Sequence, residues 1–248
     1  MELLSGKTIL VTGAAKRVGA AIARRLHGGG ARLALHYRSA EGEATALAAE
    51  LNARRPDSAA VFPADLLAAA DLPALVAAVV ARFGGLDGLV NNASSFFPTP
   101  VGTIDEGAWA DLVGSNFKAP LFLAQAAAPH LAARQGVIVN ITDIHAERPL
   151  KGYALYCAAK GALLTLTRAL AIELAPQVRV NAVAPGAILW PTDGQFPTPD
   201  RSAIVDHTLL KREGSPADIA ASVYFLLAEA PYITGQVLNV DGGRTAHL

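Results

Sequence analysis

The sequence contains little that would support a disulfide or attract a charged polymer. Its one cysteine, Cys157, cannot form an intramolecular disulfide, and its first residues lack the long apolar region of a signal peptide. Basic and acidic residues number 21 each, so a formal net charge of zero gives no attraction for nucleic acid or an anionic membrane. No uncharged apolar run approaches the roughly 18 residues of a membrane span. These absences predict a cytoplasmic protein that binds neither nucleic acid nor membrane.

Metal-ligand spacing is also missing. The six histidines are scattered, so no metal site is predicted, and at most one histidine is expected near a functional site. What the chain does have is apolar content: 52% of its 248 residues are hydrophobic, which is enough to bury a large core. We therefore expect one domain over residues 1–248.

Short apolar runs alternate with helical patterns along the whole chain. Strands are expected at residues 7–11, 32–36, 58–62, 86–90, 136–141, 178–183 and 236–240, and helices at about 17–27, 41–54, 72–83, 108–114, 117–134, 156–174 and 217–227. This alternation is typical of an α/β, Rossmann-like, doubly wound parallel sheet of seven strands, with helices on both faces. Residues 187–213, rich in proline and of mixed polarity, are expected to form a lid over the site.

The first expected strand runs directly into T-G-A-A-K-R-V-G at residues 12–19. Gly13 and Gly19 suit a backbone that turns tightly and aims amide N–H groups and a helix N-terminus at phosphate. A bare glycine pattern is a weak signal, but its position after the first strand favours a dinucleotide-binding turn.

The second strand ends in H-Y-R-S at residues 36–39, where this architecture selects between nicotinamide cofactors. No acid is present there to hold a ribose 2′-hydroxyl. Arg38 offers a forked cation and Ser39 a hydroxyl, which together suit a 2′-phosphate. The pattern predicts NADPH; the alternative, that Arg38 is only a solvated surface charge, leaves the missing acid unexplained.

Three proton-handling side chains follow the fifth strand. Tyr156 and Lys160 are four residues apart, so a helix places them on one face, where the ammonium can lower the pKa of the phenol. Asp143 precedes them at the strand end and is close enough to relay protons. Its charge would raise the pKa of the same phenol, and the sequence does not decide which effect is larger. Tyr153 has no lysine four residues on and is a poorer candidate for the acid.

The loop N-N-A-S-S-F-F-P-T-P at residues 91–100 places two aromatics directly after a buried strand. Phe96 or Phe97 can stack on a flat ligand or pack in the core, and the sequence favours neither. The helix around residues 156–174 is apolar almost all round, which indicates that another subunit covers part of it.

Taken together, these motifs, with Asn116 and the Pro-Gly pair at 185–186, resemble the short-chain dehydrogenase/reductase family over essentially the whole chain. Two departures from the usual pattern narrow the resemblance. Arg17 stands in the turn where glycine is common, and Asp143 stands thirteen residues before the tyrosine where most members have serine. These features, the H-Y-R-S motif and the aromatic loop are similar to the pteridine reductase branch.

That resemblance implies roles for individual residues. Tyr156 would donate a proton, Lys160 would bind the nicotinamide ribose and lower the tyrosine pKa, Asn116 would anchor a water-linked proton path, and Asp143 would orient Tyr156. The implied cofactor-binding set is Gly13, Arg17, Val18, Gly19, Tyr37, Arg38, Ser39, Asp65, Leu66, Asn91, Ala93, Lys160, Pro185 and Gly186. The implied substrate-binding set is Arg17, Ser94, Phe96, Asp143 and Tyr156, with the pterin between Phe96 and the nicotinamide. The family also implies a homotetramer.

The leading hypothesis is an NADPH-dependent reductase of pterins or dihydropterins, dihydrofolate included. A second is a carbonyl reductase that acts on a 3-oxoacyl thioester, with Thr142 as an alternative for the serine role, although a shift of one residue along a strand turns a side chain to the opposite face. A third is a non-catalytic NADP(H)-binding regulator, which would not need Asn116, Tyr156 and Lys160 together.

Overall fold

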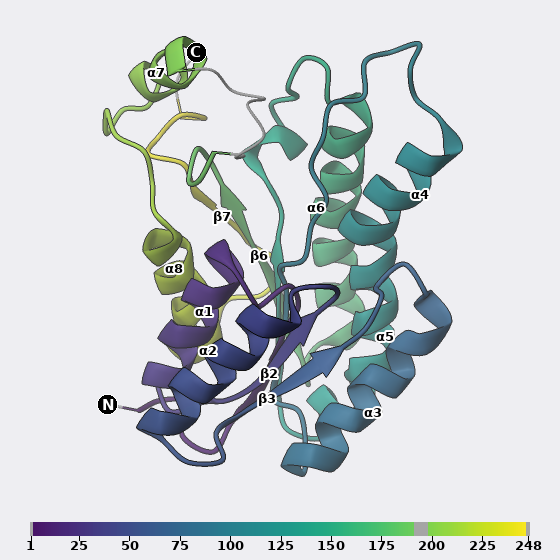
Figure 1. Ribbon diagram of the computed structural model, residues 1–248, viewed down its shortest axis with the longest axis vertical. Helices are drawn as coiled ribbons and strands as arrows, with labels where there is room; N and C mark the ends of the chain where they lie inside the picture. The colour runs from purple at the N-terminus through teal and green to yellow at the C-terminus, as the bar shows by residue number, and fades with distance from the viewer. Residues whose placement is uncertain (1, 191–197, 247–248) are drawn as a thin grey trace.

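The computed structural model describes residues 2–190 and 198–246, and these contain one seven-stranded sheet (Figure 1). The strands are β1 (Thr8–Val11), β2 (Arg32–Tyr37), β3 (Ala59–Pro63), β4 (Gly88–Asn91), β5 (Val137–Ile141), β6 (Arg179–Pro185) and β7 (Val237–Val240). They lie in the order β3-β2-β1-β4-β5-β6-β7, and each adjacent pair is parallel. The chain reverses its direction of winding between β1 and β4, which is where such sheets bind ligands.

Helices cover both faces of this sheet. They are α1 (Arg17–Gly28), α2 (Glu41–Arg54), α3 (Leu72–Phe83), α4 (Glu106–Val113), α5 (Ala119–Ala132), α6 (Ala154–Leu174), α7 (Thr198–Asp206) and α8 (Pro216–Ala228). Side chains of α1, α2 and α8 belong to one core cluster, and those of α3, α5 and α6 to the other, in keeping with their places in Figure 1. The doubly wound parallel sheet expected from the sequence is confirmed.

The alternation of side chains along each strand builds the two cores. In β1, Ile9 and Val11 point into the cluster with α1 and α8, whereas Leu10 between them points into the cluster with α3 and α5. All three are at most 2% exposed. Each such side chain contributes about 1.5–3 kcal/mol through burial. A strand buried on both faces therefore appears in the sequence as a continuous apolar run, which is why the positions of these strands could be predicted.

Two helical features were not expected. A π-helix, Gly114–Lys118, joins α4 to α5, so the two helices predicted at 108–114 and 117–134 form one helical stretch. Leu67 packs directly over Gly114, and a Cβ there would lie 2.6 Å from its Cδ2. The second feature is α7, which lies within the segment expected to be an irregular lid.

The apolar helix α6 belongs to the core. By length and composition alone it could cross a membrane. Here Lys160 Nζ donates to Ile141 O at 2.9 Å, and Asn140 of β5 donates to Thr167 Oγ1 at 2.9 Å, so its polar groups are bonded to the sheet. Among its large apolar side chains, Ile172 is exposed. We therefore assign α6 as a buried core helix.

Candidate active site

A cavity of about 690 Å³ opens at the carboxyl edge of the sheet, and it contains most of the residues that the sequence singled out. Its wall includes Gly13, Arg17, Val18, Gly19, Tyr37, Arg38, Ser39, Asp65, Leu66, Ala93, Ser94, Phe96, Asp143, Tyr156, Lys160, Pro185 and Gly186. Asn91 and Asn116 are not part of this wall. Asn91 instead donates to Asn140 Oδ1 at 2.8 Å within the sheet.

The glycine turn between β1 and α1 leaves no room for side chains. Gly13 has φ +60°, a left-handed conformation that favours glycine. A Cβ on Gly19 would lie 2.2 Å from Gly13 O and 2.7 Å from the side-chain nitrogen of Asn92. That nitrogen donates to the carbonyl oxygens of Thr12 and Gly13, at 2.8 and 3.1 Å. The side chain of Asn92 thus holds the turn from outside.

A buried histidine fixes the same turn from the other side. Gly13 N donates to His36 Nδ1 at 3.1 Å, and His36 Nε2 lies 3.1 Å from Ala64 O. Since Nδ1 accepts, the proton must be on Nε2, which donates to Ala64. Burial lowers the pKa of His36 and so favours this neutral form. Nothing in the sequence near either residue indicates this contact.

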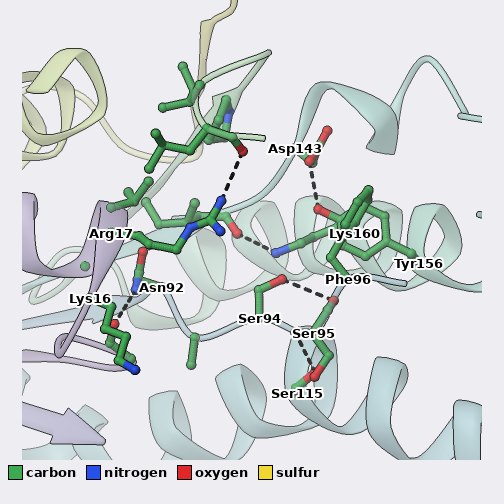
Figure 2. Close-up of a pocket in the computed structure, with 18 of the residues that line it drawn as sticks. Lys16, Arg17, Asn92, Ser94, Ser95, Phe96, Ser115, Asp143, Tyr156 and Lys160 are labelled. Carbon is green, nitrogen blue, oxygen red and sulfur yellow. Dashed lines mark hydrogen bonds between the residues drawn. The ribbon is translucent and has the colours of Figure 1, made fainter. Parts of the chain in front are cut away.

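Arg17 occupies a position that suits glycine better. Its φ of +53° is left-handed, a conformation that costs a non-glycine residue about 1–2 kcal/mol. The side chain compensates, because Arg17 Nη2 donates to the carbonyl oxygens of Leu189 and Trp190, at 3.1 and 3.3 Å. Arg17 therefore connects the turn to the first residues of the expected lid (Figure 2).

Cationic and hydroxyl groups line the outer rim beyond β2. Arg38 and Ser39 are exposed there, and Lys16 forms an ion pair with Glu43 of α2 at 2.5 Å. Asp65 lies on the same side after β3, and its Oδ1 accepts from Leu67 N at 3.0 Å. A turn with glycine at positions 13 and 19, no acid at the end of β2 and basic groups at the rim fit a phosphorylated dinucleotide.

Asp143, Tyr156 and Lys160 come together at the end of β5 (Figure 2). Tyr156 Oη donates to Asp143 Oδ2 at 2.7 Å, and Asp143 Oδ1 accepts from His145 N at 2.8 Å. Lys160 Nζ lies 5.7 Å from the centroid of the Tyr156 ring. The hydroxyl of Thr142 donates to Val183 O at 3.1 Å, so Asp143 is the residue that holds the phenol.

These contacts determine whether the pKa of Tyr156 is raised or lowered. Burial and the charge and hydrogen bond of Asp143 raise the pKa of Tyr156 well above its ordinary value. Burial lowers the pKa of Lys160 to about 8, although Asp143 opposes this shift. Of the two opposing effects that the sequence left undecided, that of Asp143, together with burial, is the larger in this geometry. Tyr156 is therefore a protonated phenol at neutral pH, and Lys160 is still largely cationic.

Asn116 lies in the π-helix and is buried beneath the loop after β4. Its Nδ2 donates to the carbonyl oxygens of Ser95 and Leu112, at 2.9 and 3.0 Å, and its Oδ1 accepts from Ser94 Oγ at 2.7 Å. Asn116 thus reaches the cavity through Ser94 and not directly.

The aromatic loop supplies one ring to the cavity. Phe96 stacks on Tyr153 with ring centroids 4.6 Å apart, and it meets Tyr156 edge-on at 4.8 Å. Leu150 also lines the cavity near this cluster. Phe96 therefore packs against the protein and also lines the cavity, and stacking of this ring on a flat ligand stays a prediction.

The expected lid is only partly described. Trp190 Nε1 donates to Glu213 Oε1 at 2.6 Å, and Ile204 of α7 lines the cavity. Residues 191–197, with Phe196 among them, lie outside the described part of the chain. The remaining lining residues include some that the sequence analysis missed, chiefly His36, His145 and Arg244. Two histidines thus line the cavity, where at most one was expected.

A dinucleotide turn, a basic rim and a buried tyrosine–lysine pair at the switch point of a parallel sheet define a nicotinamide-dependent oxidoreductase. Comparison with known proteins agrees with this class. A family model described as enoyl-(acyl carrier protein) reductase matches residues 13–245. The chain belongs to the short-chain dehydrogenase/reductase family and is an NAD(P)-dependent reductase.

Curated relatives carry different substrate names. Pteridine reductase 1 of Leishmania tarentolae is 42% identical, and the match covers 94% of each chain. An uncharacterised oxidoreductase of Methylorubrum extorquens is 36% identical, over 98% of this chain and 99% of the other. A 3-oxoacyl-(acyl-carrier-protein) reductase of Staphylococcus aureus is 35% identical, over 96% and 97%. Similarity alone leaves the substrate open between these groups.

Proposed function

We propose that this protein is a cytoplasmic, NADPH-dependent reductase of pterins and dihydropterins, dihydrofolate included. The observation that carries the proposal is the 2.7 Å hydrogen bond from Tyr156 to the Asp143 carboxylate, beside a ring, Phe96, that faces the same cavity. The pteridine reductase relative, at 42% identity, supports the same choice.

The chemistry of a C=N bond explains why a carboxylate beside the phenol is useful. Its reduction needs hydride at carbon and a proton at nitrogen. Bound NADPH supplies the hydride. Tyr156, kept protonated by burial and by Asp143, donates the proton through Oη, and the buried ammonium of Lys160 stabilises the phenolate left behind. Phe96 offers a flat apolar surface for the pterin ring.

NADPH is the proposed cofactor because no acid stands at the end of β2. Arg38 and Ser39 are exposed at the rim of the cavity, where a 2′-phosphate would lie. Lys16 adds a further positive charge, shared with Glu43.

A carbonyl reductase is the second candidate, since relatives with that name are 35% identical over nearly the whole chain. Reduction of a ketone places negative charge on oxygen, where a serine hydroxyl helps as a donor. The hydroxyl of Thr142 already donates to Val183 O, and that of Ser94, which also forms a hydrogen bond with Tyr156, donates to Asn116 Oδ1. The geometry therefore favours the pterin.

The test is NADPH oxidation with 7,8-dihydrobiopterin and 7,8-dihydrofolate, beside a 3-oxoacyl thioester, with NADH as the cofactor control. We expect turnover of the dihydropterins with NADPH preferred, and loss of that turnover in Asp143→Ser. Turnover of the thioester alone, retained or increased in Asp143→Ser, would instead support a carbonyl reductase. NADPH binding with turnover of none of these would support a regulator.

The proposal includes a homotetramer. Several large apolar side chains are exposed on the described surface, among them Trp109 on α4, Ile172 on α6, and Tyr232 and Leu238 near β7. Burial of such residues stabilises assemblies of like chains. Light scattering at micromolar concentration is expected to give the mass of four chains, and the mass of one chain would contradict this part of the proposal.

A further inference from the structure

The turn after β7 holds a cationic side chain at the wall of the cavity. Both carboxylate oxygens of Asp241 are used to fix this turn: Oδ1 accepts from Gly243 N at 2.9 Å, and Oδ2 accepts from Thr245 N and Oγ1 at 2.8 and 2.7 Å. Arg244 lies between these residues, is half-buried and lines the cavity. The backbone that carries Arg244 is therefore rigid.

The same turn is joined to the cofactor side and to the end of the lid. Gly186 N donates to Val240 O at 3.0 Å, and a Cβ on Gly186 would lie 2.7 Å from Asp241 Cα, so the two segments are in close contact. On the other side, the amides of Leu209 and Leu210 donate to Gly242 O, at 2.9 and 3.1 Å. Arg244 thus has a fixed position between β6 and the segment after α7.

The guanidinium of Arg244 is available to a ligand. Within the part of the chain that the structure describes, no residue accepts a hydrogen bond from it or forms an ion pair with it, although the cavity holds Asp143 and the turn holds Asp241. Burial lowers the pKa of Arg244, and these two carboxylates act in the opposite direction from beyond ion-pair distance. Arg17, by contrast, donates to the lid carbonyls.

A partly buried guanidinium without an acceptor is suited to a ligand anion. Its planar fork matches a carboxylate with two parallel hydrogen bonds. The reacting ring must lie at Tyr156 and Asp143, so the anion bound by Arg244 belongs to another part of the substrate. We propose that Arg244 binds a carboxylate on the side chain of the substrate, so that pterins with a carboxylated side chain are preferred over pterins with a neutral one.

This inference rests on the proposed function, and it makes Arg244 a specificity-determining residue. The test compares three substrates with NADPH: 7,8-dihydrofolate, whose glutamate carries two carboxylates; 7,8-dihydropteroate, which has only the aryl carboxylate; and 7,8-dihydrobiopterin, which has none. The variants are Arg244→Gln, which removes the charge, and Arg244→Lys, which keeps the charge without the fork. Arg54→Gln, at an exposed arginine paired with Glu50 on α2 and not part of the cavity wall, is the matched control.

In Arg244→Gln, the ratio of kcat/KM for dihydrofolate to that for dihydrobiopterin is expected to fall about tenfold, mostly through KM, as for the loss of one charge-assisted hydrogen bond. Arg244→Lys is expected to recover part of the ratio, and Arg54→Gln to leave it unchanged. If the ratio of kcat/KM for dihydropteroate to that for dihydrobiopterin falls equally, Arg244 binds the aryl carboxylate. If that ratio is unchanged while the ratio for dihydrofolate falls, Arg244 binds the glutamate. Both results support the proposal.

An equal loss for all three substrates would overturn the inference, because Arg244 would then act through Asp143 or through the fold. An unchanged ratio in Arg244→Gln would overturn it as well. If the wild-type protein turns over none of the three pterins, the proposed function fails and this inference with it. The two failures are distinguishable, since one is seen in the wild type and the other only in the variants.

Discussion

The buried imidazole of His36 joins the glycine turn to the end of β3, and its removal should affect both stability and cofactor binding. It is 2% exposed, accepts from Gly13 N and donates to Ala64 O. His36→Leu fills much of the volume but leaves both backbone groups without a partner. At about 0.5–1.5 kcal/mol for each hydrogen bond, the free energy of unfolding is expected to fall by about 1–3 kcal/mol.

Two further variants separate the two hydrogen bonds. The side-chain oxygen of Asn lies near the place of Nδ1, so His36→Asn can keep the bond from Gly13. The amide nitrogen of Gln reaches the place of Nε2, so His36→Gln can keep only the bond to Ala64. Because Gly13 lines the cavity, we expect the Kd for NADPH to rise about tenfold in the Gln variant and less than threefold in the Asn variant.

The titration of His36 adds a pH dependence of known sign. Burial lowers its pKa in the folded state below the ordinary 6.5. The unfolded chain therefore takes up this proton near pH 6.5 and the folded chain only at lower pH, so stability is lost as the pH falls below about 6.5. The loss is at most about 1.4 kcal/mol per pH unit. The pKa of His27 is lowered too, but His27 is present in every variant and cancels in the comparison.

The assays are urea unfolding followed by tryptophan fluorescence, at about pH 7.5 and about pH 5.5, and NADPH titration at the higher pH. The difference in stability between the two pH values should be smaller in His36→Asn than in the wild type. An unchanged difference, together with equal NADPH affinities in the Asn and Gln variants, would refute the role assigned to this imidazole.

Further predictions concern the reaction itself. Tyr156→Phe should lower kcat by about 10²–10⁴ while the Kd for NADPH changes less than threefold; unchanged turnover would exclude Tyr156 as the acid. NADPH binding should weaken as the pH rises through about 8, because Lys160 loses its charge there, and Lys160→Met should remove that dependence in fluorescence titrations. Arg17→Gly should keep stability within about 1 kcal/mol, since relief of the left-handed backbone offsets the lost lid contacts, yet raise KM for the dihydropterin; an unchanged KM would contradict its role at the lid. Asp143→Asn should lower the pKa of Tyr156, which is seen as tyrosinate absorbance at lower pH than in the wild type and absent from the double variant with Tyr156→Phe.

The parts of the site that the sequence could predict are those set by local spacing. Tyr156 and Lys160 share a face of α6 because they are four residues apart, and Gly13 and Gly19 shape one turn. The strands were found because a parallel strand buried on both faces is a short apolar run between turn residues. In each case the relevant interaction lies within a few residues along the chain.

The parts that escaped prediction depend on register and long-range contact. His36 meets Gly13 because β2 pairs with β1 in one particular register, and nothing near either residue indicates it. Arg244 reaches the cavity only because the Asp241 turn closes against Gly186. Asn116 lies in a π-helix, Gly114–Lys118, which the sequence pattern did not indicate.

The raised pKa of Tyr156 determines which other group the proton transfer requires. Burial and Asp143 keep the phenol protonated over the whole neutral range, so the acid is present in the form that reduction needs. The phenolate that donation leaves behind lies beside a carboxylate 2.7 Å away, which makes this form costly in either direction of the reaction. Lys160 Nζ, 5.7 Å from the centroid of the tyrosine ring, is the cation that offsets this cost. Asp143 therefore orients the acid and holds it protonated, and the ammonium of Lys160 favours the donation.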